Sequence, residues 1–409
     1  MMRDVAIIGV GMTRFGKYLS KSLNDLVHEA VLDALSNAGA EKKHIEAAYV
    51  GNAVGGLMTG QEMIRGQVAL STMGIDSIPI YNVESACASS SSAFNLAWTA
   101  VAAGVHDCAL VVGCEKLYDR DKAKSFKALG TAVDLVNGMD YFKKAEEKST
   151  SGDKIIMEGS GEKRSIFMDM YSFLIKDYMR KYGLTRNHFA ALAVKSHKNG
   201  ALNPHAQYQN EVTLEEVLNS GEVVYPLTRM MCSPVGDGAA AAVICSKTKA
   251  AQFTTKPIWV AGSVLGSGKI TFDTGDSVTR RLAPKIYEAA GVGPEDIDVV
   301  EVHDATSPSE IMFLIELGLC PPEEATRCIE DGRLELGGRM PSNPSGGLAS
   351  KGHPVGATGC AMIYEIVQQL RGAAGKRQVL NNPKIGMTHN GGGILGIDAA
   401  SMALHIFKR

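Results

Sequence analysis

Two successive rounds of the same secondary-structure order run through this chain of 409 residues. Short apolar segments rich in β-branched residues alternate with amphipathic helical segments, a pattern typical of an α/β fold. The run GDGAAAAVICS at 236–246, late in the first round, is echoed by GGGILGIDAASMAL at 391–404 in the second. Chance similarity between glycine- and alanine-rich strands would explain the echo but not the shared element order. We therefore predict an internal duplication.

The two rounds give a definite set of expected elements. In the first round, hydrophobic periodicity predicts strands at 5–10, 45–54, 78–84 and 108–116, and helices at 21–38, 61–73 and 85–104. After a strand at 233–247, the second round predicts strands at 258–268 and 297–305 and a terminal strand pair at 385–407, with helices at 277–292, 307–319 and 354–372.

The segment between the rounds has a different character. It is charged, has few buried-strand signals and contains one long helical pattern at 164–183. We expect an inserted loop domain at 116–230, partly mobile around 143–163. The predicted N-terminal half then comprises 1–115 plus 231–255, and the C-terminal half comprises 256–409.

Composition limits the partners and sites that we expect. The chain carries 42 basic and 44 acidic side chains, so its net charge of −2 gives no electrostatic case for nucleic acid or a membrane surface. Its eight cysteines include no C-x-x-C pair, so no metal site is expected. The cysteine usage, an N-terminus without signal-peptide pattern and the lack of a membrane-length apolar run predict a cytoplasmic protein.

Cys87 is the first candidate for chemistry. It follows a predicted strand and opens a predicted helix, where free backbone N–H groups and the helix dipole would stabilise a thiolate. Small neighbours, from Ala86 to Ser90, would leave room for a substrate. The alternative is an inert buried thiol.

His353 is the second candidate, in the run SKGHPVGATG at 350–359. Pro354 suits the first turn of a helix, so His353 also lies at a helix start, now in the second half. If a pseudo-twofold axis relates the halves, the two helix starts face each other. A histidine and a cysteine would then meet in the contact that activates a nucleophile. The alternative is a histidine that only caps a loop.

Two further segments contribute candidates. His303 and Asp304 end a predicted strand, where α/β folds build their sites, although a strand-end histidine could simply meet solvent. His303 could hydrogen-bond a thioester carbonyl and Asp304 could orient a neighbour. In the run HNGGG at 389–393, the glycines allow close approach to a ligand, although a tight turn would also use them. The N–H groups of Gly391 and Cys87 could form an oxyanion hole.

These segments, in this order, resemble the thiolase superfamily over nearly the whole chain. The motifs are SACASSS for the nucleophile, HDAT for the strand-end histidine, SKGHPVGATG for the activating histidine, and HNGGG near the C-terminus. HDAT and HNGGG are most similar to the sterol-carrier-protein-X-type and archaeal thiolases. The late cysteine of degradative thiolases is absent here, and Ala305 stands where some relatives carry a cysteine.

The resemblance implies a role for each matched residue. Cys87 would be acylated, His353 would accept its proton, and His303 would support the oxyanion. His389 occupies the place of the second, acid/base cysteine, and the adjacent Asn390, Gly391 and Gly392 would contribute to oxyanion and substrate binding. The fold implied is a duplicated five-layered α/β/α/β/α core with the inserted loop domain over the coenzyme A site.

The activity implied is acyl transfer: cleavage of a 3-oxoacyl-CoA by coenzyme A, or the reverse Claisen condensation, through an acyl-Cys87 intermediate. Coenzyme A is a substrate and no bound cofactor is expected. Acetoacetyl-CoA and benzoylsuccinyl-CoA are both candidate substrates. A condensing synthase, and a retro-aldolase or non-catalytic subunit of this fold, remain alternatives. The resemblance also implies a homodimer core and allows a separate small subunit with an OB fold and a zinc ribbon.

Overall fold

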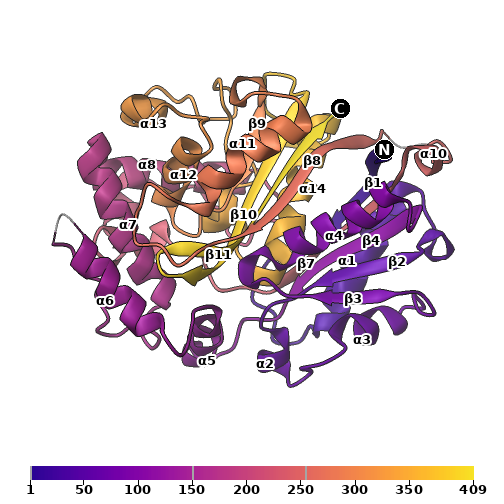
Figure 1. Ribbon diagram of the computed structural model, residues 1–409, viewed down its shortest axis with the longest axis horizontal. Coiled ribbons are helices and arrows are strands. Elements are labelled where there is room, and N and C mark those ends of the chain that lie inside the picture. The colour runs from indigo at the N-terminus through magenta and orange to yellow at the C-terminus, as the bar shows by residue number, and fades with distance from the viewer. Residues whose placement is uncertain (1, 150–151, 254–255) are drawn as a thin grey trace.

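The computed structural model describes residues 2–149, 152–253 and 256–409. The predicted five layers are confirmed: sheet strands of each half lie between helices (Figure 1). Helices α1 and α3 cover the first half, α11 and α12 cover the second, and α4 and α14 pack together between them. None of the described helices is long and apolar enough to cross a membrane.

The N-terminal half has nearly the predicted elements. Its strands are β1 (Val5–Met12), β2 (Ala47–Gly51), β3 (Ile80–Val83), β4 (Cys108–Glu115) and β7 (Gly238–Ser246). Its helices are α1 (Leu23–Ala38), α2 (Gly55–Thr59), α3 (Arg65–Ser71), α4 (Ser89–Ala103) and α10 (Lys247–Ala250). Ser22 caps α1 through its side chain, and Gly39 ends the helix in the left-handed conformation.

The C-terminal half also follows the prediction. Its strands are β8 (Ile258–Ser267), β9 (Val299–Val302), β10 (Ile385–Leu395) and β11 (Asp398–Lys408). Its helices are α11 (Val278–Ala290), α12 (Ser307–Glu316), α13 (Ala325–Glu330) and α14 (Thr358–Arg371).

Strand order demonstrates the duplication. The sheet order is β3-β2-β4-β7-β1-β8-β11-β10-β9. In each half the last strand, β7 or β11, runs antiparallel between the first strand and the strand before it. The two segments whose sequences echo each other therefore hold equivalent places. The sequence did not show that the halves join edge to edge, where β1 pairs with β8 at Ala6–Trp259 and Ile7–Ile258.

The segment between β4 and β7 is mostly helical. It contains α5 (Lys122–Leu129), α6 (Gly138–Lys148), α7 (Ile166–Tyr182), α8 (Arg186–Ala201) and α9 (Leu214–Leu218), with a small hairpin of β5 (Glu222–Val224) and β6 (Leu227–Thr228). Helix α8 packs against α12 of the second half. The expected mobility around 143–163 stays a prediction. Helix α6 covers its start, and residues 150 and 151 lie outside the described part of the chain.

The serine run at the start of α4 explains how the central layer closes. Ser90 and Ser91 are buried, and the Ser90 hydroxyl accepts a hydrogen bond from the Cys360 N–H of α14 at 3.0 Å. A Cβ at Gly113 or Gly359 would overlap these two serines, so the elements approach closely. We expected the small residues around Cys87 to leave room for substrate. That expectation was wrong for Ala86, Ala88, Ser89 and Ser90, which do not line the cavity and instead allow tight packing.

Phe94 tests the importance of this central layer. Its side chain is fully buried, and its ring centroid lies 4.9 Å from that of His405 and 5.8 Å from that of Phe407. Phe94→Ala should lower the free energy of unfolding by about 3–5 kcal/mol, because it leaves a cavity. The control Leu96→Ala, on the same helix but 43% exposed, should change it by about 0.5 kcal/mol or less. If urea unfolding showed the same loss of unfolding free energy for both variants, this description of the packing would be contradicted.

Candidate active site

Cys87 lies in a strained turn before α4. The turn Ala86–Ala88 places Ala86 at a φ of +49°, a left-handed conformation that is costly for a residue with a side chain. Hydrogen bonds hold this strain in place. The Glu84 carboxylate accepts the Ala86 N–H at 2.6 Å, and the Ser89 hydroxyl donates to the Ala86 carbonyl at 2.6 Å. Strain held at a single residue is typical of functional sites.

The structure brings Cys87, His303 and His353 together. One side-chain atom of each, the sulfur or a ring nitrogen, lies within 4.8 Å of the others. The two imidazole rings meet edge to face with centroids 5.1 Å apart. His303 follows β9 and His353 precedes the turn into α14, so the meeting of two helix starts arises as the duplication predicts. Such spacing could also hold a metal ion.

Hydrogen bonds assign His303 a donor role. The Asn390 Nδ2 lies 3.0 Å from His303 Nδ1, and the Asn390 Oδ1 accepts from the Ser91 hydroxyl. Because an amide nitrogen only donates, His303 Nδ1 must accept, and the ring proton of neutral His303 lies on Nε2. This Nε2–H can donate to an oxygen that gains negative charge.

His353 has the opposite tautomer. The Thr358 hydroxyl donates to the Pro354 carbonyl at 3.0 Å, so it accepts from His353 Nδ1 at 2.7 Å. His353 Nε2 is then unprotonated and can accept the proton of Cys87. The two histidines therefore differ in tautomer, because Asn390 donates to Nδ1 of His303 whereas Thr358 accepts from Nδ1 of His353.

Burial sets the charges of this cluster. Desolvation, reinforced by the nearby Glu115, raises the pKa of Cys87 to about 12. Desolvation, with His303 and Lys351 nearby, lowers the pKa of His353 well below its usual value. The predicted effect of the helix start has the expected sign, because a hydrogen bond from the Cys87 backbone N–H lowers the pKa of the thiol, but desolvation outweighs it. Both shifts favour a neutral thiol and a neutral imidazole over a thiolate–imidazolium pair.

Gly392 lies directly against the backbone of Cys87. A Cβ at this position would overlap the Ser85 carbonyl and lie 2.6 Å from the Ala88 nitrogen and 2.9 Å from the Cys87 nitrogen. Gly391 and Gly392 both line the cavity, and a Cβ on Gly391 would instead meet Met402. Of the two glycines suggested for an oxyanion hole, Gly392 is the one that packs on the Cys87 N–H region.

His389 is not brought to Cys87. It is fully buried and is absent from the cavity wall among the described residues. Its Nδ1 accepts from the His303 backbone N–H at 3.4 Å, and its Nε2 lies 3.0 Å from the Thr279 hydroxyl. Burial lowers its pKa to about 3. With both nitrogens engaged, this geometry does not support the acid/base role suggested by the sequence.

Asp304 also lies behind the site. It is fully buried, its Oδ1 accepts the Leu348 N–H at 2.7 Å, and burial raises its pKa. Its carboxyl group holds the loop before His353 rather than a substrate. Asn390, in turn, acts on His303 as described above and does not line the cavity.

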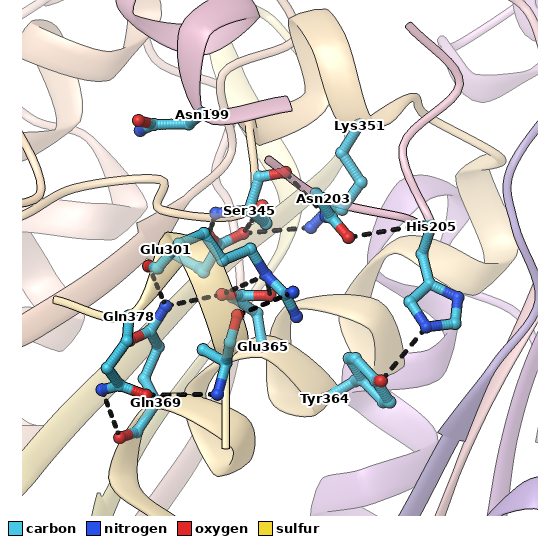
Figure 2. Close-up of polar contacts among 12 residues, drawn as sticks. Asn199, Asn203, His205, Glu301, Ser345, Lys351, Tyr364, Glu365, Gln369 and Gln378 are labelled. Atoms are coloured by element: carbon cyan, nitrogen blue, oxygen red, sulfur yellow. Dashed lines mark hydrogen bonds and ion pairs between the residues drawn. The ribbon is translucent and has the colours of Figure 1, made fainter. Parts of the chain in front are cut away.

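A buried ion pair ties the two histidine segments together and was not foreseen from the sequence. Lys351 Nζ lies 3.0 Å from Glu301 Oε2, with side chains 1% and 0% exposed (Figure 2). Glu301 is two residues before His303, and Lys351 is two residues before His353. The Ser345 hydroxyl also donates to Glu301 at 2.7 Å. The pair fixes the relative placement of the two imidazoles.

Cys87, His303 and His353 all line one large cavity of about 850 Å³. Much of its wall comes from the segment between β4 and β7, including Tyr171 of α7. Burial raises the pKa of Tyr171, and the proximity of Cys87 and Asp304 adds to this shift. No motif in the sequence singled out α7 as part of the site.

Comparison with known proteins identifies the family. Family models described as "Thiolase, N-terminal domain" and "Thiolase C-terminal domain-like" match residues 5–248 and 271–406. The chain belongs to the thiolase family. An acetyl-CoA acetyltransferase of Methanothermobacter thermautotrophicus is 39% identical over 413 residues, covering 100% of both proteins.

Other relatives support the same thiolase branch. Benzoylsuccinyl-CoA thiolase subunit BbsB of Thauera aromatica is 35% identical, covering 96% of this chain and 95% of that protein. Human sterol carrier protein 2 is 34% identical, covering 98% and 71%. The solved Ltp2-ChsH2(DUF35) aldolase shares the fold, with a TM-score of 0.76, 23% identity and coverage of 99% and 97%. This thiolase is an acyltransferase.

Gly392→Ala tests the approach of the backbone to Cys87. The added methyl group has no space beside Ser85 and Cys87, so acyl transfer should fall by about 10²-fold or more, as expected when an oxyanion donor is displaced. The control Gly138→Ala adds its methyl group into open space and should keep full activity. Near-normal turnover by Gly392→Ala would contradict this geometry.

Lys351→Met tests the buried ion pair. Removing the lysine leaves the buried Glu301 without its ion-pair partner, which should lower the free energy of unfolding by about 3–5 kcal/mol. As a control, Lys198→Met removes an exposed pair with Glu335 and should cost about 1 kcal/mol or less. Urea unfolding measures both, and a Lys351→Met loss no larger than the control would show that the pair does not hold the structure.

Proposed function

We propose that this thiolase cleaves a 3-oxoacyl-CoA with Cys87 as nucleophile and His353 as the proton carrier. The Cys87 sulfur attacks the 3-keto carbon while its proton passes to His353 Nε2. The bond between carbons 2 and 3 then breaks, giving acyl-Cys87 and the enolate of the shorter acyl-CoA. The Nε2–H of His303 and the backbone beside Gly392 stabilise the developing oxyanions.

A single imidazole is sufficient for every proton transfer. His353 gives the Cys87 proton to the departing enolate carbon, which becomes a methyl group or methylene group. It then removes the thiol proton of incoming coenzyme A, whose sulfur attacks acyl-Cys87. Finally it returns that proton to the Cys87 sulfur as the new acyl-CoA leaves. A single proton carrier agrees with two observations: in the part of the chain that the structure describes, no second cysteine joins the cluster of Cys87, His303 and His353, and both ring nitrogens of His389 are engaged.

We propose that coenzyme A enters beneath α5. Lys17 and Lys122 are exposed residues of the cavity wall on this side, and Lys17 Nζ lies 5.5 Å from the Tyr118 ring centroid. The two lysines supply charge for the phosphates. Residues 116–230 would form the loop domain over this entrance, which agrees with their large share of the cavity wall.

The size of the cavity favours a substrate larger than acetoacetyl-CoA. About 850 Å³ leaves room for a bulky acyl group beside the pantetheine arm. The similarity to an enzyme named for benzoylsuccinyl-CoA is compatible with this. Cleavage by thiol attack is favoured over retro-aldol cleavage, because an aldolase has no use for a cysteine paired with an unprotonated imidazole.

We further propose that the enzyme is a cytoplasmic homodimer and works with a separate small subunit. All eight cysteines are free, which suits a reducing compartment. Relatives named as a thiolase subunit and as a complex with ChsH2(DUF35) support a partner chain. Light scattering of the isolated chain tests the dimer.

Intact-protein mass after incubation with acyl-CoA tests the nucleophile. The wild-type protein should gain one acyl group, and Cys87→Ala should gain none and lose transferase activity. Cys232 also lines the cavity, so Cys232→Ala is the matched control and should still be acylated once. Acylation of Cys87→Ala, or normal turnover by it, would refute the assignment.

A double substitution tests the entrance for coenzyme A. Lys17→Ala with Lys122→Ala should raise KM for coenzyme A about tenfold, because two charges near phosphates are lost, and should leave kcat nearly unchanged. The effect should shrink at high salt. An unchanged KM at low salt would place the phosphates elsewhere.

A further inference from the structure

One wall of the cavity leads away from Cys87 along helix α7. Tyr171, Leu174 and Tyr178 all line the cavity and follow one another at helical spacing, so they share one face of α7. Tyr171 is the member near Cys87. At 1.5 Å per residue, Tyr178 lies roughly 10 Å further along the helix. The facing wall is α12, which begins just after the His303 loop and contributes Met312, Phe313 and Glu316. We call this part of the cavity the acyl arm.

The acyl arm is apolar along its length and polar at its far end. Glu316 is the last residue of α12, and both its oxygens are held. The Tyr178 hydroxyl donates to Oε1 at 2.8 Å, and the Ser277 hydroxyl donates to Oε2 at 2.7 Å. All three residues line the cavity. A carboxylate oxygen has capacity for two hydrogen bonds, so Glu316 can accept more from a ligand.

The stability of the fold does not explain why a carboxylate group occupies position 316. A carboxylate at the C-terminal end of a helix opposes the helix dipole, and Glu316 is only 8% exposed. Burial raises its pKa. The nearest cation, Arg280, reaches the Tyr178 hydroxyl at 3.5 Å, and its own Nε is buried without a partner. A polar group that costs stability and faces a cavity is a candidate for ligand recognition.

The charges at this end discriminate between ligands. Asp276 and Asp398 also line the cavity, and the guanidinium of Arg281 is already engaged by both. A carboxylate or phosphate brought here would meet these acidic groups, since neither Arg280 nor Arg281 is among the described residues of the cavity wall. The walls nearer Cys87 are apolar, so the ligand must be mostly hydrocarbon with one hydrogen-bond donor at its tip.

We propose that the acyl arm selects 3-oxoacyl-CoA substrates whose long acyl chain carries a distal hydroxyl group. The inference rests on the proposed thiolase reaction and adds its substrate class. The hydrocarbon chain lies along Tyr171, Leu174 and Phe313, and the hydroxyl donates to Glu316. An acyl chain that ends in a carboxylate is disfavoured. Glu316 is thus a specificity-determining residue outside the reacting cluster.

Three matched substrates test this proposal: 3-oxodecanoyl-CoA, 10-hydroxy-3-oxodecanoyl-CoA and 3-oxodecanedioyl-CoA. The wild-type enzyme should have a kcat/KM for the hydroxy substrate about tenfold or more above that for the methyl-ended chain, the factor expected of a hydrogen bond to a carboxylate. The chain with a terminal carboxylate should be the poorest of the three.

Substitutions at the polar end of the acyl arm test whether Glu316 causes the preference for a distal hydroxyl group. Glu316→Leu should abolish the preference for the hydroxy substrate. Glu316→Gln should reduce this preference and raise kcat/KM for the substrate with a terminal carboxylate. If the Glu316 variants do not fold, Tyr178→Phe and Ser277→Ala should each shift the same ratio. The exposed control Glu323→Leu should preserve the wild-type ratio.

The outcomes separate the two proposals. Turnover of the three substrates with equal kcat/KM by the wild-type enzyme would overturn the distal-hydroxyl inference and leave the thiolase reaction intact. An unaltered hydroxyl preference in folded Glu316→Leu would overturn the role of Glu316. Failure of every 3-oxoacyl-CoA to be cleaved would overturn the proposed function itself.

Discussion

Desolvation of one thiol and two imidazoles, which line one cavity, is the constraint on which this active site depends. Cys87, His303 and His353 lie where the two halves of a duplicated fold meet, and desolvation moves the pKa values of all three toward their neutral forms. A neutral thiol is a poor nucleophile. In the proposed reaction, its proton therefore leaves as the bond to the substrate forms, and hydrogen-bond donors already in place stabilise the oxygen that gains negative charge. The fixed tautomers of the two histidines provide both conditions.

The rest of the fold maintains this arrangement. The small residues of α4 allow it to pack tightly against α14, so the turns that carry Cys87 and His353 come together. The Glu301–Lys351 pair joins the strand that precedes His303 to the loop that carries His353 (Figure 2). Two charges buried together rarely add net stability, but they specify one geometry when both are present. We interpret the pair as a device for relative placement of the imidazoles.

Much of the fold was predictable from sequence, because its elements repeat and their periodicity is strong. The duplicated order, the terminal strand pair and the helix starts at Cys87 and His353 all follow from pattern. The burial of individual residues, and their position relative to the cavity, cannot be predicted from the pattern. His389 and Gly392 belong to one short motif, yet a strand advances about 3.4 Å per residue, so the two lie in different surroundings. The tautomers of the two histidines depend on Asn390 and Thr358, and the polar end of the acyl arm depends on Tyr178 and Glu316. No local sequence pattern encodes the contacts that these residues make.

The resting state of Cys87 is the most direct test of the central claim. The rate of iodoacetamide alkylation of Cys87, followed by mass spectrometry in the absence of substrate, reports its thiolate fraction as pH changes. Since burial raises the pKa of this thiol, the account predicts a rate that keeps rising with pH beyond about pH 9, the range where an ordinary thiol levels off. A plateau with a midpoint at or below neutral pH would reveal a resting thiolate–imidazolium pair and contradict the account.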